Sequence, residues 1–176
     1  MAHISLDETL PGMRSLLAFH PAIAPALTGL MGVMMRSQEG LCSGERELIA
    51  AYVSRLNHCT ACENIHSAIA CHLLDVNEIT LNSIKQDFSA VTISDRLKAL
   101  LTIAQKIQRG GTHVTASQVA NAKAMGCTDV EIHDTVLIAA LFCMFNRYID
   151  GLGLESHDTP GTLNERGQHI AINGYS

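Results

Sequence analysis

Residues 43–66 read SGERELIAAYVSRLNHCTACENIH, and this stretch decides how the chain folds. Its first part repeats apolar residues at helical spacing, in a stripe formed by Leu48, Ile49, Tyr52, Val53 and Leu56. The Ser43 hydroxyl ahead of acidic residues is typical of a helix start. Asn57 and His58 then interrupt the pattern, and a second helix is expected over residues 59–74.

Helical signals continue on both sides of this stretch. Further helices are expected over residues 22–36, 78–87, 94–108, 115–125 and 129–148. No segment alternates apolar and polar residues for long, so the sequence predicts an all-α fold. Residues 1–155 are expected to form one domain. The tail, residues 156–176, carries Pro160 and three glycines, and we expect an extended arm there rather than a helix.

Composition narrows the class of protein. A chain of 176 residues with 47% apolar and 16% charged residues suits one globular domain. The net charge of −5 and the absence of a basic cluster argue against a nucleic-acid partner. The longest apolar run, residues 136–145, is about half the length that a membrane span requires. No signal-peptide pattern opens the chain, so we expect no membrane association and a cytoplasmic location with reduced thiols.

The sequence contains a weak internal repeat. Residues 45–50, ERELIA, resemble residues 95–100, DRLKAL, and residues 75–79, DVNEI, resemble residues 128–132, TDVEI. The first copy carries two cysteines and a histidine, where the second has Thr112, Thr115 and Val119. Any chemistry is therefore expected in the first copy.

Cys59, Cys62 and His66 form the reactive constellation of that copy. On a helix, Cys59 and Cys62 are i, i+3 neighbours and Cys62 and His66 are i, i+4 neighbours, so all three share one face. The positive end of a helix lowers a thiol pKa, and an imidazole can accept the thiol proton. Such a dithiol is suited to attack an electrophilic oxygen or sulfur and then close to a disulfide.

Zinc is the main chemical rival for the same residues. Cys59, Cys62 and His66 could supply three ligands, with a fourth from Cys71, His72 or His58. The chain has no second paired ligand set at zinc-knuckle spacing, and a domain of this size needs no metal to fold, so we expect neither a metal nor another cofactor. The remaining cysteines are expected to be small core residues, namely Cys42, Cys71, Cys127 and Cys143.

The spacing E-x11-C-x2-C-x3-H from Glu47 to His66 resembles the active-site signature of the alkylhydroperoxidase D-like, or carboxymuconolactone decarboxylase, superfamily. Residues 145–155, FNRYIDGLGLE, are similar to the C-terminal helix of the peroxidase-related branch of that family. The resemblance covers roughly residues 10–155, and the internal repeat fits the repeated helical motif of the family.

The resemblance implies an antioxidant peroxidase. Cys62 matches the cysteine that attacks peroxide, Cys59 the resolving cysteine, His66 the histidine beside Cys62, and Glu47 the acid of a proton relay. Ala61 stands where well-known members carry a second histidine. His58 is a candidate substitute, but we expect it to be an exposed loop residue. The implied partners are a small hydroperoxide and a dithiol electron donor, either a lipoyl group or a thioredoxin-like protein.

Two interpretations of Glu47 compete. Twelve residues of unbroken helix would place Glu47 about 18 Å from Cys59, so a relay requires the chain to break near Asn57. Periodicity puts Glu47 nearly opposite the apolar stripe, which indicates a solvated side chain, whereas the motif indicates a carboxylate buried by another helix. We follow the motif.

Two other functions stay open at this stage. One is a decarboxylase-like lactone enzyme on the same fold, and the other is a helical stress or binding module with an idle dithiol. The charged fraction of 16% lies below the ~25% typical of soluble proteins. Together with the apolar circumference of the helices and with the resemblance, this predicts a homo-oligomer, a trimer or a hexamer.

Overall fold

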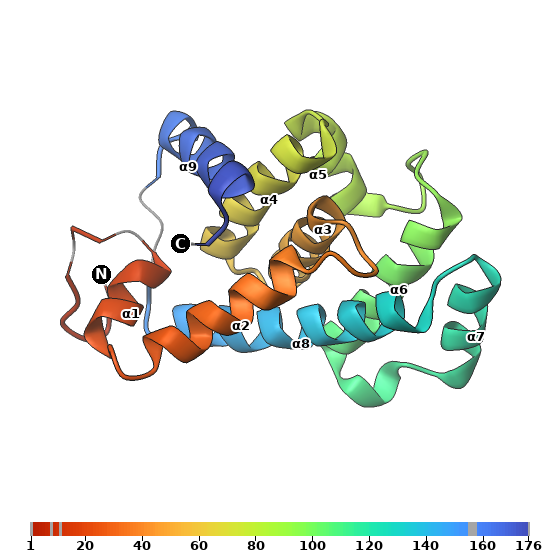
Figure 1. The fold of residues 1–176 in the computed structure, drawn as a ribbon, viewed down its shortest axis with the longest axis horizontal. Helices are drawn as coiled ribbons and strands as arrows, with labels where there is room; N and C mark the ends of the chain where they lie inside the picture. Colours follow the sequence, from red (N-terminus) through yellow and green to blue (C-terminus); the bar gives the residue numbers. More distant parts are fainter. Residues whose placement is uncertain (1, 8, 11, 155–157, 176) are drawn as a thin grey trace.

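The computed structural model describes residues 2–7, 9–10, 12–154 and 158–175, and within these ranges the chain is helical without strands (Figure 1). The predicted all-α class is confirmed. The helices are α1 (Met13–Phe19), α2 (Ala24–Arg36), α3 (Ser43–Leu56), α4 (Thr60–Leu74), α5 (Glu78–Asp87), α6 (Asp95–Arg109), α7 (Ala116–Ala124), α8 (Asp129–Gly151) and α9 (Pro160–Asn173), with a 3-10 turn η1 (Gly111–His113) after α6.

Side-chain caps explain where most of these helices begin. Asn77, Ser94, Thr115 and Thr128 each accept a hydrogen bond from a backbone N–H three residues later, which satisfies a group left unpaired at a helix start. Helix α3 begins at Ser43 as predicted, but its cap lies one residue earlier. There the carboxylate of Glu45 accepts from the Cys42 N–H at 3.2 Å.

Helix α3 lies at the centre of the fold, against α2, α4, α5, α6 and α8. Ten of its fourteen residues are buried, including the polar side chains Arg46, Glu47 and Ser54. The main hydrophobic core surrounds this helix and draws on α2 and on every helix from α3 to α8. Because neighbours cover α3 nearly all round, helical periodicity does not mark a solvated face on it.

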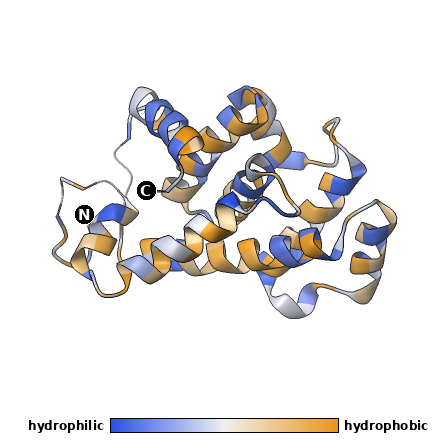
Figure 2. Cartoon of the chain, viewed as in Figure 1, coloured by the Kyte–Doolittle hydropathy of each residue, from blue (hydrophilic) through white to orange (hydrophobic). Residues whose placement is uncertain are grey.

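Helix α8 is long and apolar enough to span a membrane by length and composition (Figure 2). More than half of its most apolar window, 56%, is nevertheless buried inside the protein, against α3 and α6. It also carries the buried polar residues Glu131, Asp134, Thr135 and Asn146. These are properties of the core helix of a globular domain.

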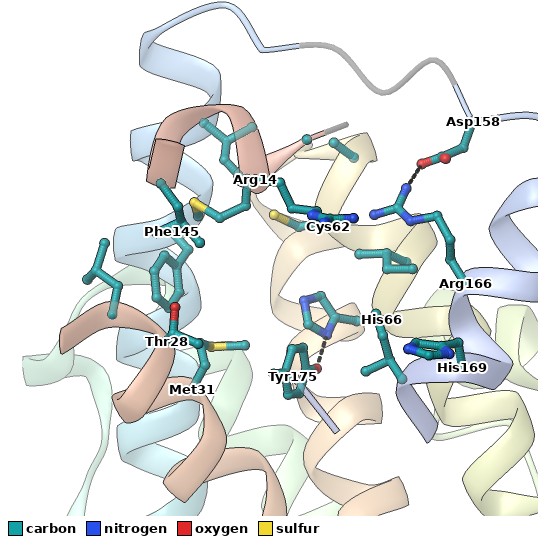
Figure 3. A pocket seen from close by; sticks show the side chains of 18 of the residues that line it. Arg14, Thr28, Met31, Cys62, His66, Phe145, Asp158, Arg166, His169 and Tyr175 are labelled. Carbon is teal, nitrogen blue, oxygen red and sulfur yellow. Dashed lines mark hydrogen bonds and ion pairs between the residues drawn. The ribbon is translucent and has the colours of Figure 1, made fainter. Parts of the chain in front are cut away.

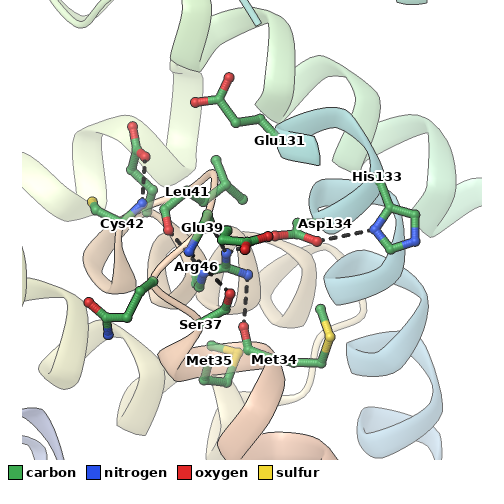
Figure 4. Close-up of polar contacts among 12 residues, drawn as sticks. Met34, Met35, Ser37, Glu39, Leu41, Cys42, Arg46, Glu131, His133 and Asp134 are labelled. Carbon is green, nitrogen blue, oxygen red and sulfur yellow. Dashed lines mark hydrogen bonds and ion pairs between the residues drawn. The ribbon is translucent and has the colours of Figure 1, made fainter. Parts of the chain in front are cut away.

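Arg46 fastens the loop between α2 and α3 (Figure 4). Its guanidinium is fully buried, donates to the carbonyl oxygens of Met34 and Leu41 at 2.9 and 3.0 Å, and pairs with Asp134 of α8 at 2.7 Å. A buried guanidinium needs all of these partners, because an unpaired buried charge is costly. The contacts hold the end of α2 and the start of α3 on α8.

The internal repeat has a physical counterpart. Arg96 occupies the position in the second copy that Arg46 occupies in the first, and both arginines pair with an acidic residue of α8. Arg96 donates to Glu131 at 2.9 Å and also reaches Glu45 of α3 at 2.6 Å. Both copies of the motif therefore dock on the same helix by the same kind of ion pair.

The expectation of an extended C-terminal arm is wrong for residues 160–173, which form α9. Thr159 caps this helix and Pro160 stands at its first position, where the ring favours helical backbone and no N–H is needed. Helix α9 lies beside α4 (Figure 1). Gly167 is buried against Ala68, so close that an added Cβ would lie 2.7 Å from the Ala68 Cβ. The expected boundary between residues 155 and 156 lies outside the described residues.

Candidate active site

A break between α3 and α4 brings the predicted site residues together. Asn57 ends α3, and His58 adopts a left-handed backbone with φ of 61°, a conformation that costs a non-glycine residue of order 1–3 kcal/mol. Asn57 is held in place by a hydrogen bond from its Nδ2 to Asn146 at 2.8 Å. Helix α4 then runs back along α3, so that Glu47 lies opposite His66.

Both cysteines of the motif are buried at the start of α4. Cys59 is its N-cap and Cys62 lies in its first turn, in a small cluster with Leu16 of α1 and Ile149 of α8. All six cysteines are free thiols in this structure. Cys62 faces a cavity, whereas Cys59 lies behind it and is fully buried.

The two neighbouring thiols differ in acidity. The Cys59 thiol lowers the pKa of Cys62; the neighbouring His66 and the Asn146 side chain lower it further against the opposing effect of burial. The Cys62 thiol in turn raises the pKa of Cys59, as do its burial and the Asp150 carboxylate. Cys62 is therefore the thiol poised to ionise, and Cys59 is its proton-bearing neighbour.

Glu47 is fully buried in a cluster of donors, so the interpretation that it is solvated is wrong. Its Oε2 lies 2.7 Å from Nδ1 of His66, and its Oε1 accepts from Arg36 at 2.7 Å. The Tyr175 hydroxyl donates to both oxygens, at 2.7 and 2.8 Å. These partners satisfy a carboxylate that burial alone would make unstable.

The orientation of His66 follows from this cluster. A carboxylate only accepts hydrogen bonds, so Nδ1 of His66 carries a proton, and in a neutral imidazole Nε2 is then the nitrogen with the lone pair. Phe142 packs edge-on against the imidazole, with ring centroids 4.6 Å apart. Helix α4 places His66 one turn after Cys62, and both side chains line the same cavity (Figure 3).

The cavity has a volume of about 670 Å³. Its walls come from α1, α2, α4, α8 and α9, and most of them are apolar: Met13, Leu17, Leu27, Met31, Ile65, Phe142, Phe145, Ile149 and Ile170. Arg14, Arg166 and His169 add polar groups. A cavity of this size accepts an organic molecule much larger than hydrogen peroxide.

The structure thus brings together Glu47, Cys59, Cys62 and His66, all four of which were predicted from the sequence. It does not add His58, whose side chain is exposed and makes no hydrogen bond within the described part of the chain. The zinc alternative finds no ligand set: among the residues that the structure describes, no three or more His, Cys, Asp or Glu side chains are grouped so that they could hold a metal ion.

Sequence reasoning missed Arg36, Tyr175 and Asn146 as members of the site. Asn146 lies within the stretch of α8 that carries the resemblance, and its position after Phe145 was a usable signal. Arg36 was seen only as the end of a helix. Tyr175 lies 128 positions from Glu47 in a tail without periodicity, and no local pattern indicates it.

No protein-family model and no curated protein matches the sequence. The chain is similar in structure to the alkylhydroperoxidase AhpD core of an uncharacterized peroxidase-related protein from Ralstonia eutropha JMP134, with a TM-score of 0.80 and 24% identity over 90% of this chain and 82% of that one. It is also similar to an uncharacterized peroxidase-related protein from Silicibacter sp. TM1040, with a TM-score of 0.75 and 22% identity over 81% and 74% of the two chains.

At sequence identities of 22–24%, the structural similarity establishes the fold alone. The order of helices, the break before the two cysteines and the buried glutamate are features of this chain itself. The chain has the alkylhydroperoxidase AhpD core fold that the resemblance in its sequence implies.

Proposed function

We propose that this protein is a thiol-dependent peroxidase that reduces hydroperoxides through Cys59 and Cys62. The observation that carries the proposal is the asymmetry of the two thiols. Cys62 lines the cavity and has a lowered pKa, whereas the neighbouring Cys59 is fully buried, does not line the cavity and has a raised pKa. A dithiol peroxidase requires one accessible, acidic thiol that attacks the substrate and a second thiol beside it that resolves the sulfenic acid.

In the first step the Cys62 thiolate attacks the terminal oxygen of a hydroperoxide. The O–O bond breaks, the alkoxide leaves, and Cys62 becomes a sulfenic acid. His66 accepts the thiol proton at Nε2 and returns it to the leaving alkoxide, which departs as an alcohol. Glu47, bonded to Nδ1, stabilises the imidazolium while it carries that proton.

In the second step the Cys59 sulfur attacks the sulfenic sulfur of Cys62. A Cys59–Cys62 disulfide forms, and the hydroxyl group leaves as water with the proton of Cys59. The Asp150 carboxylate, which interacts with the Cys59 thiol, can accept this proton and pass it to the leaving hydroxyl group.

An external dithiol then reduces the disulfide and is itself oxidised to a disulfide. By resemblance, this donor is a lipoyl group or a thioredoxin-like protein. The apolar walls of the cavity are suited to the alkyl chain of a lipoyl group as well as to an organic hydroperoxide. Such a donor requires a reducing compartment, in keeping with the expected cytoplasmic location.

Hydroperoxide consumption with dihydrolipoamide as reductant tests the proposal. We expect catalytic consumption of cumene hydroperoxide by the unmodified protein and none by the Cys62→Ser variant. Cys42→Ser, which changes an exposed cysteine away from the site, is the matched control and should keep full activity. If neither dihydrolipoamide nor a thioredoxin supports consumption above the background rate, the peroxidase proposal is wrong and the dithiol is idle.

We also propose that the chain assembles into a trimer or a hexamer. Large apolar side chains remain exposed on α2 and α8: Leu30 is 40%, Val33 70%, Leu137 37% and Met144 45% exposed. A surface of this kind favours association between copies. Sedimentation equilibrium at micromolar concentration should give three or six times 19.0 kDa, and a single 19.0 kDa species would refute the assembly.

A further inference from the structure

The end of the chain reaches into the candidate active site. Helix α9 packs along α4 through Gly167, and Gly174, with a left-handed φ of 79°, ends the helix and turns the chain inward. Tyr175 follows directly and lines the same cavity as Cys62 and His66 (Figure 3). The packing of α9 on α4 therefore places Tyr175 next to Glu47 and His66, although Tyr175 is distant from both in sequence.

The hydroxyl of Tyr175 lies at the junction of the relay. It donates to both oxygens of Glu47, at 2.7 and 2.8 Å, and lies 3.2 Å from Nδ1 of His66. The Arg36 guanidinium lies over the face of the Tyr175 ring in a cation–π contact, with its central carbon 5.0 Å from the ring centroid. Arg36 also donates to Glu47 and to the backbone carbonyl of Ile170 in α9.

These contacts restrain the rotation of the Glu47 carboxylate. Arg36 bonds one oxygen and His66 the other, so the carboxylate bridges α2 and α4. Tyr175 contacts both oxygens at once, and a turn of the carboxylate about its own axis breaks at least one of these two bonds. A group that must hold an imidazole in one orientation requires such restraint.

The hydroxyl provides this restraint without adding a charge. Burial and the neighbouring Glu47 raise the pKa of Tyr175 well above its usual value, so it remains a neutral donor across the physiological range. A neutral donor leaves the negative charge of Glu47 available to the imidazolium of His66.

We propose that Tyr175 is a positioning residue of the peroxidase site: its hydroxyl holds the Glu47 carboxylate against Nδ1 of His66, and docking of α9 on α4 completes the relay. The inference rests on the proposed function, because the relay is named for a peroxidase. The effect of Tyr175 on the reactivity of the Cys62 thiol, however, does not depend on a peroxide substrate. It can therefore be tested without a peroxide.

The alternative is that the Tyr175 ring only forms a wall of the cavity. The Tyr175→Phe variant separates the two roles, because it keeps the ring and removes the hydroxyl. If the ring only lines the cavity, the Tyr175→Phe variant should behave like the unmodified protein. If the hydroxyl positions Glu47, the variant should lose that effect. Tyr148→Phe, in a residue that makes no hydroxyl hydrogen bond within the described part of the chain, is the matched control.

The experiment measures the rate at which iodoacetamide alkylates Cys62 in the fully reduced protein at pH 7, together with thermal unfolding of each variant. We expect Tyr175→Phe to slow alkylation about 10-fold, the scale of a lost hydrogen bond to a charged group, and Tyr148→Phe to leave it unchanged. In a Glu47→Gln background, Tyr175→Phe should add less than about 2-fold, because the hydroxyl acts through that carboxylate. If peroxide turnover is measurable, kcat should fall while KM for the hydroperoxide stays constant.

Alkylation of Tyr175→Phe at the unmodified rate would overturn the inference, and so would full additivity with Glu47→Gln. If Tyr175→Phe unfolds at the assay temperature, alkylation of this variant and of the unmodified protein is compared below the melting point of the variant, with the same expected loss. A protein that reduces no hydroperoxide but shows the coupled loss of alkylation would refute the peroxidase proposal and support the role of Tyr175.

Discussion

The Glu47 carboxylate lies 2.7 Å from Nδ1 of His66, although the two residues stand 19 positions apart on different helices. This contact exists because the left-handed backbone of His58 reverses the chain between α3 and α4. It fixes Nδ1 as a nitrogen of the imidazole that carries a proton.

The Glu47–His66 contact predicts strongly coupled effects of mutation. Glu47→Gln and His66→Gln should each lower the rate of sulfenic acid formation by roughly 10- to 1000-fold, the scale of lost proton transfer. The double variant should be little slower than the worse single variant, because both residues serve one proton path. Stopped-flow measurement of Cys62 oxidation checks this.

Two exposed residues supply the controls for that cycle. Glu39→Gln and His113→Gln make the same chemical changes away from the site and should leave the rate unchanged. Full additivity of Glu47→Gln and His66→Gln, or a silent Glu47→Gln, would mean that the carboxylate has no part in proton transfer.

The positions of the two thiols predict different products from the two serine variants. With one equivalent of hydroperoxide, Cys59→Ser should form a stable sulfenic acid at Cys62, because the partner that condenses with it is missing. Cys62→Ser should form none, since Cys59 is fully buried and its pKa is raised. Trapping with dimedone and mass spectrometry distinguishes them. The opposite pattern would exchange the roles of the two cysteines.

The interaction between the two neighbouring thiols predicts a pH dependence. Because the pKa of Cys62 is lowered, its alkylation should reach half its maximal rate below pH ~8.5, the midpoint of an ordinary thiol. Removing the Cys59 thiol in Cys59→Ala should raise the pKa of Cys62 and move this midpoint to higher pH. An alkylation profile that Cys59→Ala leaves unchanged would show that Cys59 does not stabilise the thiolate.

The close approach of α9 and α4 predicts a packing defect on substitution. Gly167→Ala places a Cβ 3.0 Å from the Ala68 carbonyl carbon, a backbone atom that cannot move aside, and should destabilise the fold by about 1–3 kcal/mol. Gly161→Ala in the same helix meets only the Thr159 hydroxyl at 3.9 Å and should be neutral or stabilising. Thermal unfolding compares them. Equal melting temperatures would contradict the tight contact.

The sequence predicted the central helices because their local signals agree with their packing. Helices α5, α6, α7 and α8 start at hydroxyl or amide caps that stand in the sequence, and each start was placed within a residue of its position. The shared face of Cys62 and His66 followed from i, i+4 spacing alone, whereas Cys59 caps the helix and does not line the cavity.

The remainder depends on contacts that no local pattern carries. Helix α9 is mostly polar with two internal glycines, and it is held by its cap and by docking on α4 rather than by an apolar face. The cap Thr159 and the proline after it were the usable signal. Helical periodicity misjudged Glu47 because α3 is covered on nearly all sides. Tyr175 reaches the site only through the whole length of α9.

Titration of free thiols is the most direct test of the redox pair. The reduced protein has six thiols. One equivalent of hydroperoxide should remove two of them, lower the mass by about 2 Da for the two lost hydrogens, and yield one linked peptide that joins Cys59 to Cys62. The Cys62→Ser variant should lose no thiols. Retention of all six thiols after hydroperoxide treatment, or a loss that persists in Cys62→Ser, would contradict the proposed chemistry.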